Sequence, residues 1–256
     1  MLSLTTGKPN QATSPEASLG ILGGMGPLAT ADFLMKLVMA THATTDQAHI
    51  PVLLRSVPQI PDRSAAILGN GPSPLPSLIK GIEALCTAGV TAIAIPCNTA
   101  HYWYNEMAAA SMVPILHIVD SVSYHLNTMA CGGSIGLLAT KGTIAARVYN
   151  ERFTDQGSVN VLVPTDDEIE RFSGPGIDAV KAGDLAGGRG LLKEAAQRLR
   201  DRGANAIVMG CNEIPLVLTE NSRIGIPLID ATACLAHSCA SWWERQRCSE
   251  TVYQSG

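Results

Sequence analysis

The chain contains 256 residues, 46% of them hydrophobic, which is enough to build a core in one large domain or two small ones. The formal net charge is −4 and no basic run stands out, so nucleic acid and anionic membranes are not expected partners. No stretch approaches the roughly 20 apolar residues of a membrane-spanning helix. Seven cysteines without a dense spacing pattern or a secretory signal predict reduced thiols and a cytoplasmic protein. We expect residues 1–17 to form a disordered tail.

The first half predicts an alternation of strands and helices. Apolar runs predict strands at residues 19–22, 52–54, 90–95 and 113–116, with a helix near 75–88. The first strand runs directly into Gly-Gly-Met-Gly-Pro, in which the glycines indicate a tight turn and Pro27 suits the first turn of a helix.

The second half repeats this order. Its apolar runs predict strands at 134–139, 159–163, 204–209 and 226–230, and a closing helix from 231 to about 247. The spacing agrees as well, since Cys97 follows Gly20 by 77 residues and Cys211 follows Gly136 by 75. The sequence therefore predicts an α/β fold of two similar lobes, each a mostly parallel sheet flanked by helices and related by pseudo-two-fold symmetry.

Two cysteines occupy matching places in the repeat. Cys97 and Cys211 each follow an apolar run that reads as a buried strand, and each is followed by asparagine. Ligands bind beyond the carboxyl ends of parallel strands, so facing lobes would bring both thiols to one cleft. A thiol, with a pKa of about 8.5, can serve both as base and as acid on opposite faces of one carbon. We expect both thiols to precede helices, whose N-termini favour thiolates. The other five cysteines are interpreted as structural.

Polar residues beside the cysteines are candidate ligands for a substrate. Asn98 and Thr99 could bind a carboxylate or cap the next helix, and the two roles can coexist. Glu213 could hold an ammonium group or lie in the first turn of a helix. His101 could raise the thiolate fraction of Cys97 or be a packed histidine. No convincing set of zinc ligands accompanies it, so no metal is predicted.

Three further segments contain candidate residues for the same cleft. The loop at Met25 and Gly26 lacks the spacing of a dinucleotide-binding fingerprint and more plausibly presents N–H groups to a small anion, so no cofactor is predicted. Arg63 could pair with a second carboxylate through its guanidinium fork, or be a solvated loop residue. Lys181 could reach the cleft or lie on the surface.

Six motifs recur in order: Gly-Gly-Met-Gly-Pro, Gln-Ile-Pro-Asp-Arg, Pro-Cys-Asn-Thr-Ala-His, Leu-Leu-Ala-Thr-Lys-Gly-Thr-Ile, Val-Lys-Ala-Gly and Gly-Cys-Asn-Glu-Ile-Pro-Leu. This set, over about residues 18–245, resembles the aspartate/glutamate racemase family, most closely its aspartate racemase branch. The resemblance implies a pyridoxal-independent two-base mechanism at the positions of the two cysteines. It implies homodimers and a C-terminal helix that packs back on the first lobe. The implied lobes are residues 18–117 plus 229–248 and residues 118–228, with the active site between them.

The resemblance also implies roles for the candidate residues. Arg63 and Lys181 would recognise a side-chain carboxylate, and the residues after each cysteine would hold the α-carboxylate. The substrate-binding residues predicted in this way are Met25, Gly26, Arg63, Asn98, Thr99, Thr140, Lys181, Asn212 and Glu213. One departure is Asn212, because the family usually has threonine directly after the second cysteine.

The sequence thus predicts a cofactor-independent racemase that interconverts L- and D-aspartate, a small dicarboxylic amino acid. Three alternatives remain open at this point. The chain could racemise glutamate or a broader set of amino acids. It could be a thiol-dependent isomerase of the maleate type, in which a cysteine adds to a double bond. It could also be an amino-acid-binding module without catalytic activity.

Overall fold

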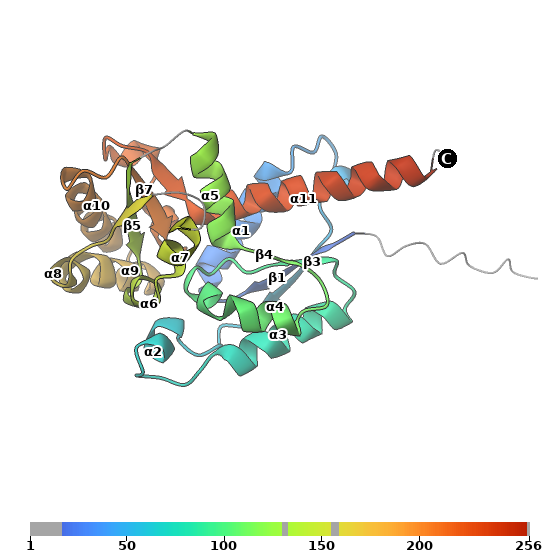
Figure 1. Cartoon of the computed structure of the whole chain (residues 1–256), viewed down its shortest axis with the longest axis horizontal. Helices are drawn as coiled ribbons and strands as arrows, with labels where there is room; N and C mark the ends of the chain where they lie inside the picture. Colours follow the sequence, from blue (N-terminus) through green and yellow to red (C-terminus); the bar gives the residue numbers. More distant parts are fainter. Residues whose placement is uncertain (1–16, 130–132, 155–158, 255–256) are drawn as a thin grey trace, which may run out of the picture.

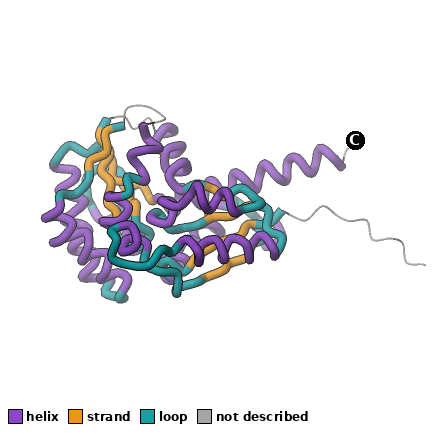
Figure 2. The backbone as a smooth tube through the Cα atoms, turned by 60° about the horizontal axis from the view of Figure 1, so that its bottom comes forward, coloured by secondary structure: helices purple, strands orange, loops and turns teal. Residues whose placement is uncertain are grey.

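A computed structural model describes residues 17–129, 133–154 and 159–254. Nearly all of the predicted tail and Cys131 lie outside these ranges. The described chain forms two four-stranded parallel sheets of identical order, β2-β1-β3-β4 and β6-β5-β7-β8 (Figures 1 and 2). The predicted fold class is therefore confirmed, and the repeat seen in the sequence is a repeat of topology.

The elements of the first half precede residue 129. Its strands and helices are β1 (Leu19–Gly23), α1 (Pro27–Ala40), β2 (Val52–Ser56), α2 (Arg63–Ile67), α3 (Leu75–Thr87), β3 (Ala92–Ala94), α4 (Tyr104–Ala110), β4 (Ile115–Leu116) and α5 (Ile118–Thr128). Those of the second half are β5 (Ser134–Ala139), α6 (Lys141–Ala145), α7 (Val148–Thr154), β6 (Asn160–Leu162), α8 (Asp166–Glu168), α9 (Gly174–Lys181), α10 (Leu185–Asp201), β7 (Ala206–Gly210), β8 (Leu228–Asp230) and α11 (Ala231–Gln254).

Burial explains why the central strands are continuously apolar. Every residue of β1 and β7 is buried, because each strand has neighbours on both sides and helices over its faces. β2 differs from the general expectation of buried strands. All five of its residues are exposed, because β2 pairs only with β1 and forms the edge of the first sheet. The hydrophobic pattern alone does not distinguish this edge strand from a central one.

The C-terminal helix ties the end of the chain to the first half. α11 packs against α1 and α5, and Figure 1 shows it running past the first sheet. It continues to Gln254, beyond the predicted end near residue 247, because no glycine or proline interrupts residues 248–254. No helix within the described ranges is long and apolar enough to cross a membrane.

Close backbone contacts at the strand ends bring the loops together. Gly24 has a φ of +93°, and a Cβ there would lie 2.4 Å from the backbone N of Val57. A Cβ on Gly142 would lie 2.5 Å from the Cα of Ser64, so α6 of the second half packs directly on α2 of the first. Only glycine permits these approaches. The first holds together two loops of the first half, and the second brings the two halves into contact.

Candidate active site

Loops from both halves enclose one small cavity of about 20 Å³, which has room for roughly one water molecule. Nine of the eleven predicted site residues line it, while Gly26 and Asn98 do not. The lining residues are Met25, Asp62, Arg63, Ser64, Cys97, Thr99, Thr140, Lys181, Cys211, Asn212 and Glu213. Both thiols therefore face one site, as the repeat requires, although each residue's role stays a prediction.

Cys211 is a protonated thiol in this structure. Its Sγ lies 2.9 Å from Oε2 of Glu213, and both residues are buried. Burial, followed by the charge of Glu213 and the hydrogen bond to it, raises the pKa of Cys211 well above its usual range. A buried thiol that donates to a carboxylate is held in its protonated form. Neither of the roles predicted for Glu213 includes this contact.

Both thiols precede helical segments, as expected, but the turn next to each thiol is 3₁₀ rather than α. Cys97 is followed by a 3₁₀-helix at Thr99–Trp103 that runs directly into α4, and Cys211 by a single 3₁₀ turn at Ile214–Leu216. The turn after Cys211 ends before the β-branched residues Val217 and Thr219, which disfavour continuation of a helix. A single turn carries little of the helix macrodipole, so other groups must govern Cys211.

His101 holds the backbone at Cys97 rather than its sulfur. Its Nδ1 is 2.9 Å from the backbone O of Cys97, and its Nε2 accepts a hydrogen bond from the N–H of Ile118. The ring is therefore a neutral tautomer that donates from Nδ1. Burial lowers the pKa of His101 to about 4. The neutral imidazole contacts the carbonyl of Cys97 and not its sulfur, so the structure favours the packed histidine of the two alternatives.

This buried imidazole predicts that the protein loses stability in mild acid. Below pH 6.5 the unfolded chain binds a proton at His101, whereas the folded chain does so only near its pKa of about 4. The difference amounts to about 2 kcal/mol of unfolding free energy between pH 7.5 and pH 5. Urea titrations at the two pH values measure it, and His101→Gln should reduce the pH dependence. An identical pH dependence in the variant would contradict the assignment.

Asn98 and Thr99 are held by hydrogen bonds rather than used as helix caps. Asn98 makes no side-chain capping bond, and its Oδ1 accepts from the hydroxyl of Tyr149. Its buried Nδ2 has no partner among the described residues. The Thr99 hydroxyl lies 3.2 Å from that of Thr140 and 2.8 Å from that of Thr143. This cluster of hydroxyls joins the two halves across one side of the cavity.

Arg63 keeps part of its guanidinium available to the cavity. Its Nη1 donates to the backbone O of Ile60 at 3.2 Å and of Pro61 at 3.0 Å. Its Nε is buried and has no partner among the described residues. Nη1 anchors the side chain to its own loop and leaves the edge formed by Nε and Nη2 to accept a carboxylate in a bidentate manner.

Lys181 contributes the second positive charge from the end of α9. Although burial lowers the pKa of Lys181, the carboxylates around it, Glu213 and Asp62 among them, help to raise that pKa overall. The ammonium group therefore stays charged. Its ion pair with Asp178 is long, at 3.8 Å, and its side chain is 40% exposed. Both predicted cations line the cavity, and Lys181 reaches it from the surface.

The prediction did not include four residues that help to build the site: Asp62, Ser64, Thr143 and Tyr149. Asp62 and Ser64 flank Arg63 in sequence, so the motif around Arg63 was an available signal. Thr143 donates its backbone N–H to the hydroxyl of Thr140, which is the N-cap pattern at the start of α6. Tyr149 reaches Asn98 from α7, and no local pattern indicates that contact.

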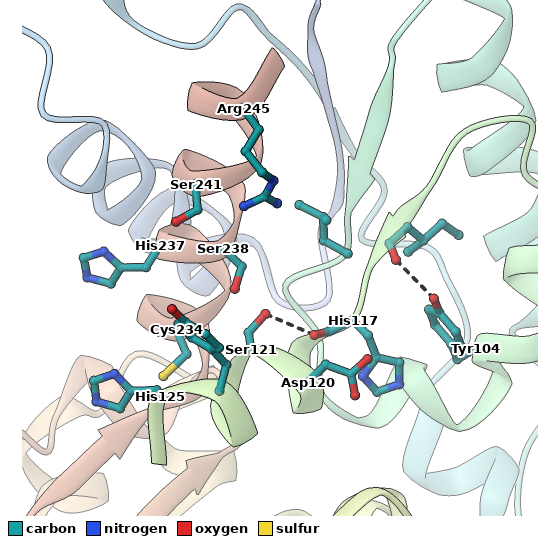
Figure 3. Close-up of a pocket in the computed structure, with 13 residues that line it drawn as sticks. Tyr104, His117, Asp120, Ser121, His125, Cys234, His237, Ser238, Ser241 and Arg245 are labelled. Atoms are coloured by element: carbon teal, nitrogen blue, oxygen red, sulfur yellow. Dashed lines mark hydrogen bonds between the residues drawn. The ribbon is translucent and has the colours of Figure 1, made fainter. Parts of the chain in front are cut away.

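A larger cavity of about 730 Å³ lies between α11, α5 and β4 (Figure 3). Figure 3 shows Ser238, Ser241 and Arg245 of α11 on one side, and His117 and Asp120 on the other. None of the predicted site residues lines it. Two of its lining residues contact His101: the ring centroids of His117 and Tyr104 lie 4.6 Å and 6.2 Å from that of His101.

Two α/β lobes with parallel sheets place a pair of thiols, a guanidinium and an ammonium group around one small cavity, which is the fold and site of an enzyme. The chain belongs to the Asp/Glu/Hydantoin racemase family, whose model matches residues 22–239. It is accordingly an amino-acid racemase.

Relatives within this family act on different amino acids. The aspartate racemase of Picrophilus torridus is 30% identical, covers 88% of this chain and 95% of its own, and superimposes with a TM-score of 0.77. The broad specificity amino-acid racemase RacX of Bacillus subtilis is 28% identical, over 87% of this chain and 96% of its own length. A glutamate racemase of Beutenbergia cavernae is 23% identical, over 68% of this chain and 63% of its own length.

Proposed function

We propose that the enzyme interconverts L- and D-aspartate without a cofactor, using Cys97 and Cys211 as the two bases. The observation that carries this proposal is the presence of both thiols on one cavity that also holds a guanidinium and an ammonium group. The likeness to the Picrophilus torridus aspartate racemase supports the choice of substrate.

The proton transfers follow from the state of Cys211. In one direction the Cys97 thiolate removes the α-proton, and the Sγ–H of Cys211 delivers a proton to the opposite face of the carbanion. The Cys211 sulfur then carries the negative charge, beside the ammonium group of Lys181. In the other direction Cys211 acts as the base, and Glu213 Oε2, 2.9 Å away, can accept its proton beforehand. Each enantiomer thus requires the opposite protonation state of the pair.

Recognition of a second carboxylate supports a dicarboxylic substrate. The free Nε edge of Arg63 suits bidentate binding of the side-chain carboxylate, and Lys181 adds a charged donor. Thr99 and Thr140 supply hydroxyl donors for the α-carboxylate. Asp62 and Glu213 are the carboxylates of this cavity that can hold the substrate ammonium.

Isotope exchange tests the proposal directly. L-Aspartate incubated with the enzyme in deuterated water, without pyridoxal phosphate, should acquire deuterium at Cα and yield D-aspartate. Proton NMR follows the exchange, and chiral chromatography measures the product. L-Glutamate and L-alanine in parallel identify a broader specificity, which the likeness to the Bacillus subtilis enzyme favours as the second candidate. Aspartate that stays protonated and fully L would contradict the proposal.

We further propose that the protein is cytoplasmic and, as the family resemblance implies, a homodimer. Met35 and Met39 on α1 are 67% and 78% exposed and supply apolar surface that a second copy could cover. Light scattering after size exclusion should give twice the chain mass of 26.9 kDa. A monomer at micromolar concentration would contradict this assembly.

A further inference from the structure

Asn212 joins the two lobes directly beside the second thiol. Its Nδ2 donates a hydrogen bond to the backbone O of Met25 at 3.0 Å, across 187 positions of sequence, and both residues are buried. Glu213 touches the same loop, since a Cβ on Gly26 would lie 3.1 Å from its Oε1. The loop after β1 and the loop after β7 therefore meet in direct contact.

Hydroxyl groups form a second contact between the lobes at this cavity. Ser64 donates to the hydroxyl of Thr140 at 3.1 Å, and both residues line the cavity. The remaining space of about 20 Å³ has room for roughly one water molecule and not for an amino acid. Entry of a substrate therefore requires the lobes to separate on at least one side.

Asparagine has the reach for this contact, and threonine does not. A threonine hydroxyl is attached directly to Cβ, whereas the amide nitrogen of Asn212 is one bond further out. With the backbone unchanged, threonine would leave the buried O of Met25 without a donor, which is unfavourable. The departure from the motif expected at this position thus creates a contact between lobes that the expected residue would not make.

We propose that Asn212 is a latch that sets the separation of the lobes at Cys211 and thereby selects aspartate over longer amino acids. This inference rests on the proposed racemase function and assigns the substrate selectivity of the same site. The Asn212–Met25 hydrogen bond re-forms after aspartate binds. Glutamate is one methylene longer and keeps the lobes too far apart for this bond. One methylene in a substrate typically changes kcat/KM by roughly 10–200-fold. The Asn212 contact therefore has to produce a preference for aspartate in this range.

Thiol labelling of the unliganded protein tests the latch independently of turnover. Asn212→Thr and Asn212→Leu remove the bond, and the leucine variant keeps the branching and the number of side-chain heavy atoms. Iodoacetamide labelling, read by peptide mass spectrometry, should modify Cys97 and Cys211 at least about fivefold faster in both variants. Asn160→Ala is the matched control, because Asn160 donates to Ser134 within one lobe at an exposed position. Buried Cys239 should stay unlabelled throughout, which excludes general unfolding.

Kinetics then test the selectivity. The ratio of kcat/KM for aspartate to that for glutamate should fall roughly tenfold or more in both Asn212 variants and stay unchanged in Asn160→Ala. Unchanged labelling of Cys97 and Cys211 would overturn the latch, and faster labelling with an unchanged ratio would overturn its role in selectivity. If the wild-type protein racemises nothing, the labelling result still decides the latch, and the failure belongs to the proposed function.

Discussion

Alanine at either Cys97 or Cys211 should slow racemisation of aspartate by roughly 10²–10⁴-fold, the usual contribution of a general acid or base. Both thiols line the same cavity and are 3% exposed, so bulk solvent has little access to either sulfur. Loss of one sulfur leaves one face of Cα without a proton donor. The rate of D-aspartate formation from L-aspartate, measured by chiral chromatography, checks this expectation.

A half-reaction should distinguish the two alanine variants. Cys211→Ala retains Cys97 as base and should exchange the α-proton of only one enantiomer with deuterium, without inversion. Cys97→Ala should do so only with the other enantiomer. Cys248→Ala, which removes an exposed free thiol, should behave as wild type. Full racemisation by either single variant would remove the two-base mechanism.

Loss of the guanidinium in Arg63→Ala should lower kcat/KM for aspartate on the order of 100-fold or more. Hydrogen bonds to charged groups each contribute about 1.5–3 kcal/mol, and the open edge of Arg63 can make two of them. The loss should be much smaller for an amino acid without a side-chain carboxylate. Steady-state kinetics with aspartate and alanine as substrates provide the comparison.

Two further variants control for charge and for folding. Arg63→Lys keeps the charge and loses the fork, so it should recover only part of the activity with aspartate. Arg171→Ala removes an exposed arginine that pairs with Asp167, and its kinetics should match wild type. Equal losses for aspartate and alanine in Arg63→Ala would show that Arg63 does not recognise the side-chain carboxylate.

Much of the fold could be predicted because its determinants are local. Apolar runs that end in glycine or asparagine mark parallel strands, and their recurrence in the second half predicts the same topology twice. The predicted helix near 75–88 matches α3 at Leu75–Thr87. The exposure of β2 could not be predicted, because edge and central strands can carry the same apolar residues.

The site was predictable where a residue type and its position at a strand end suffice. Cys97, Cys211 and Arg63 were singled out in this way, and all three line the cavity. The protonation of the site was not predictable in this way. The neutral state of His101 depends on its burial and on the Cys97 carbonyl, and the raised pKa of Cys211 depends on burial and on Glu213.

The sequence by itself determined two parallel lobes and a thiol at the end of a matching strand in each, because strand periodicity and strand-end chemistry act over a few residues. Only the tertiary structure decided how the lobes meet. The Asn212–Met25 bond and the hydroxyl cluster of Thr99, Thr140 and Thr143 join residues that are far apart in sequence. The physical reason is that a hydrogen bond depends on separations of about 3 Å, which no spacing along the chain specifies.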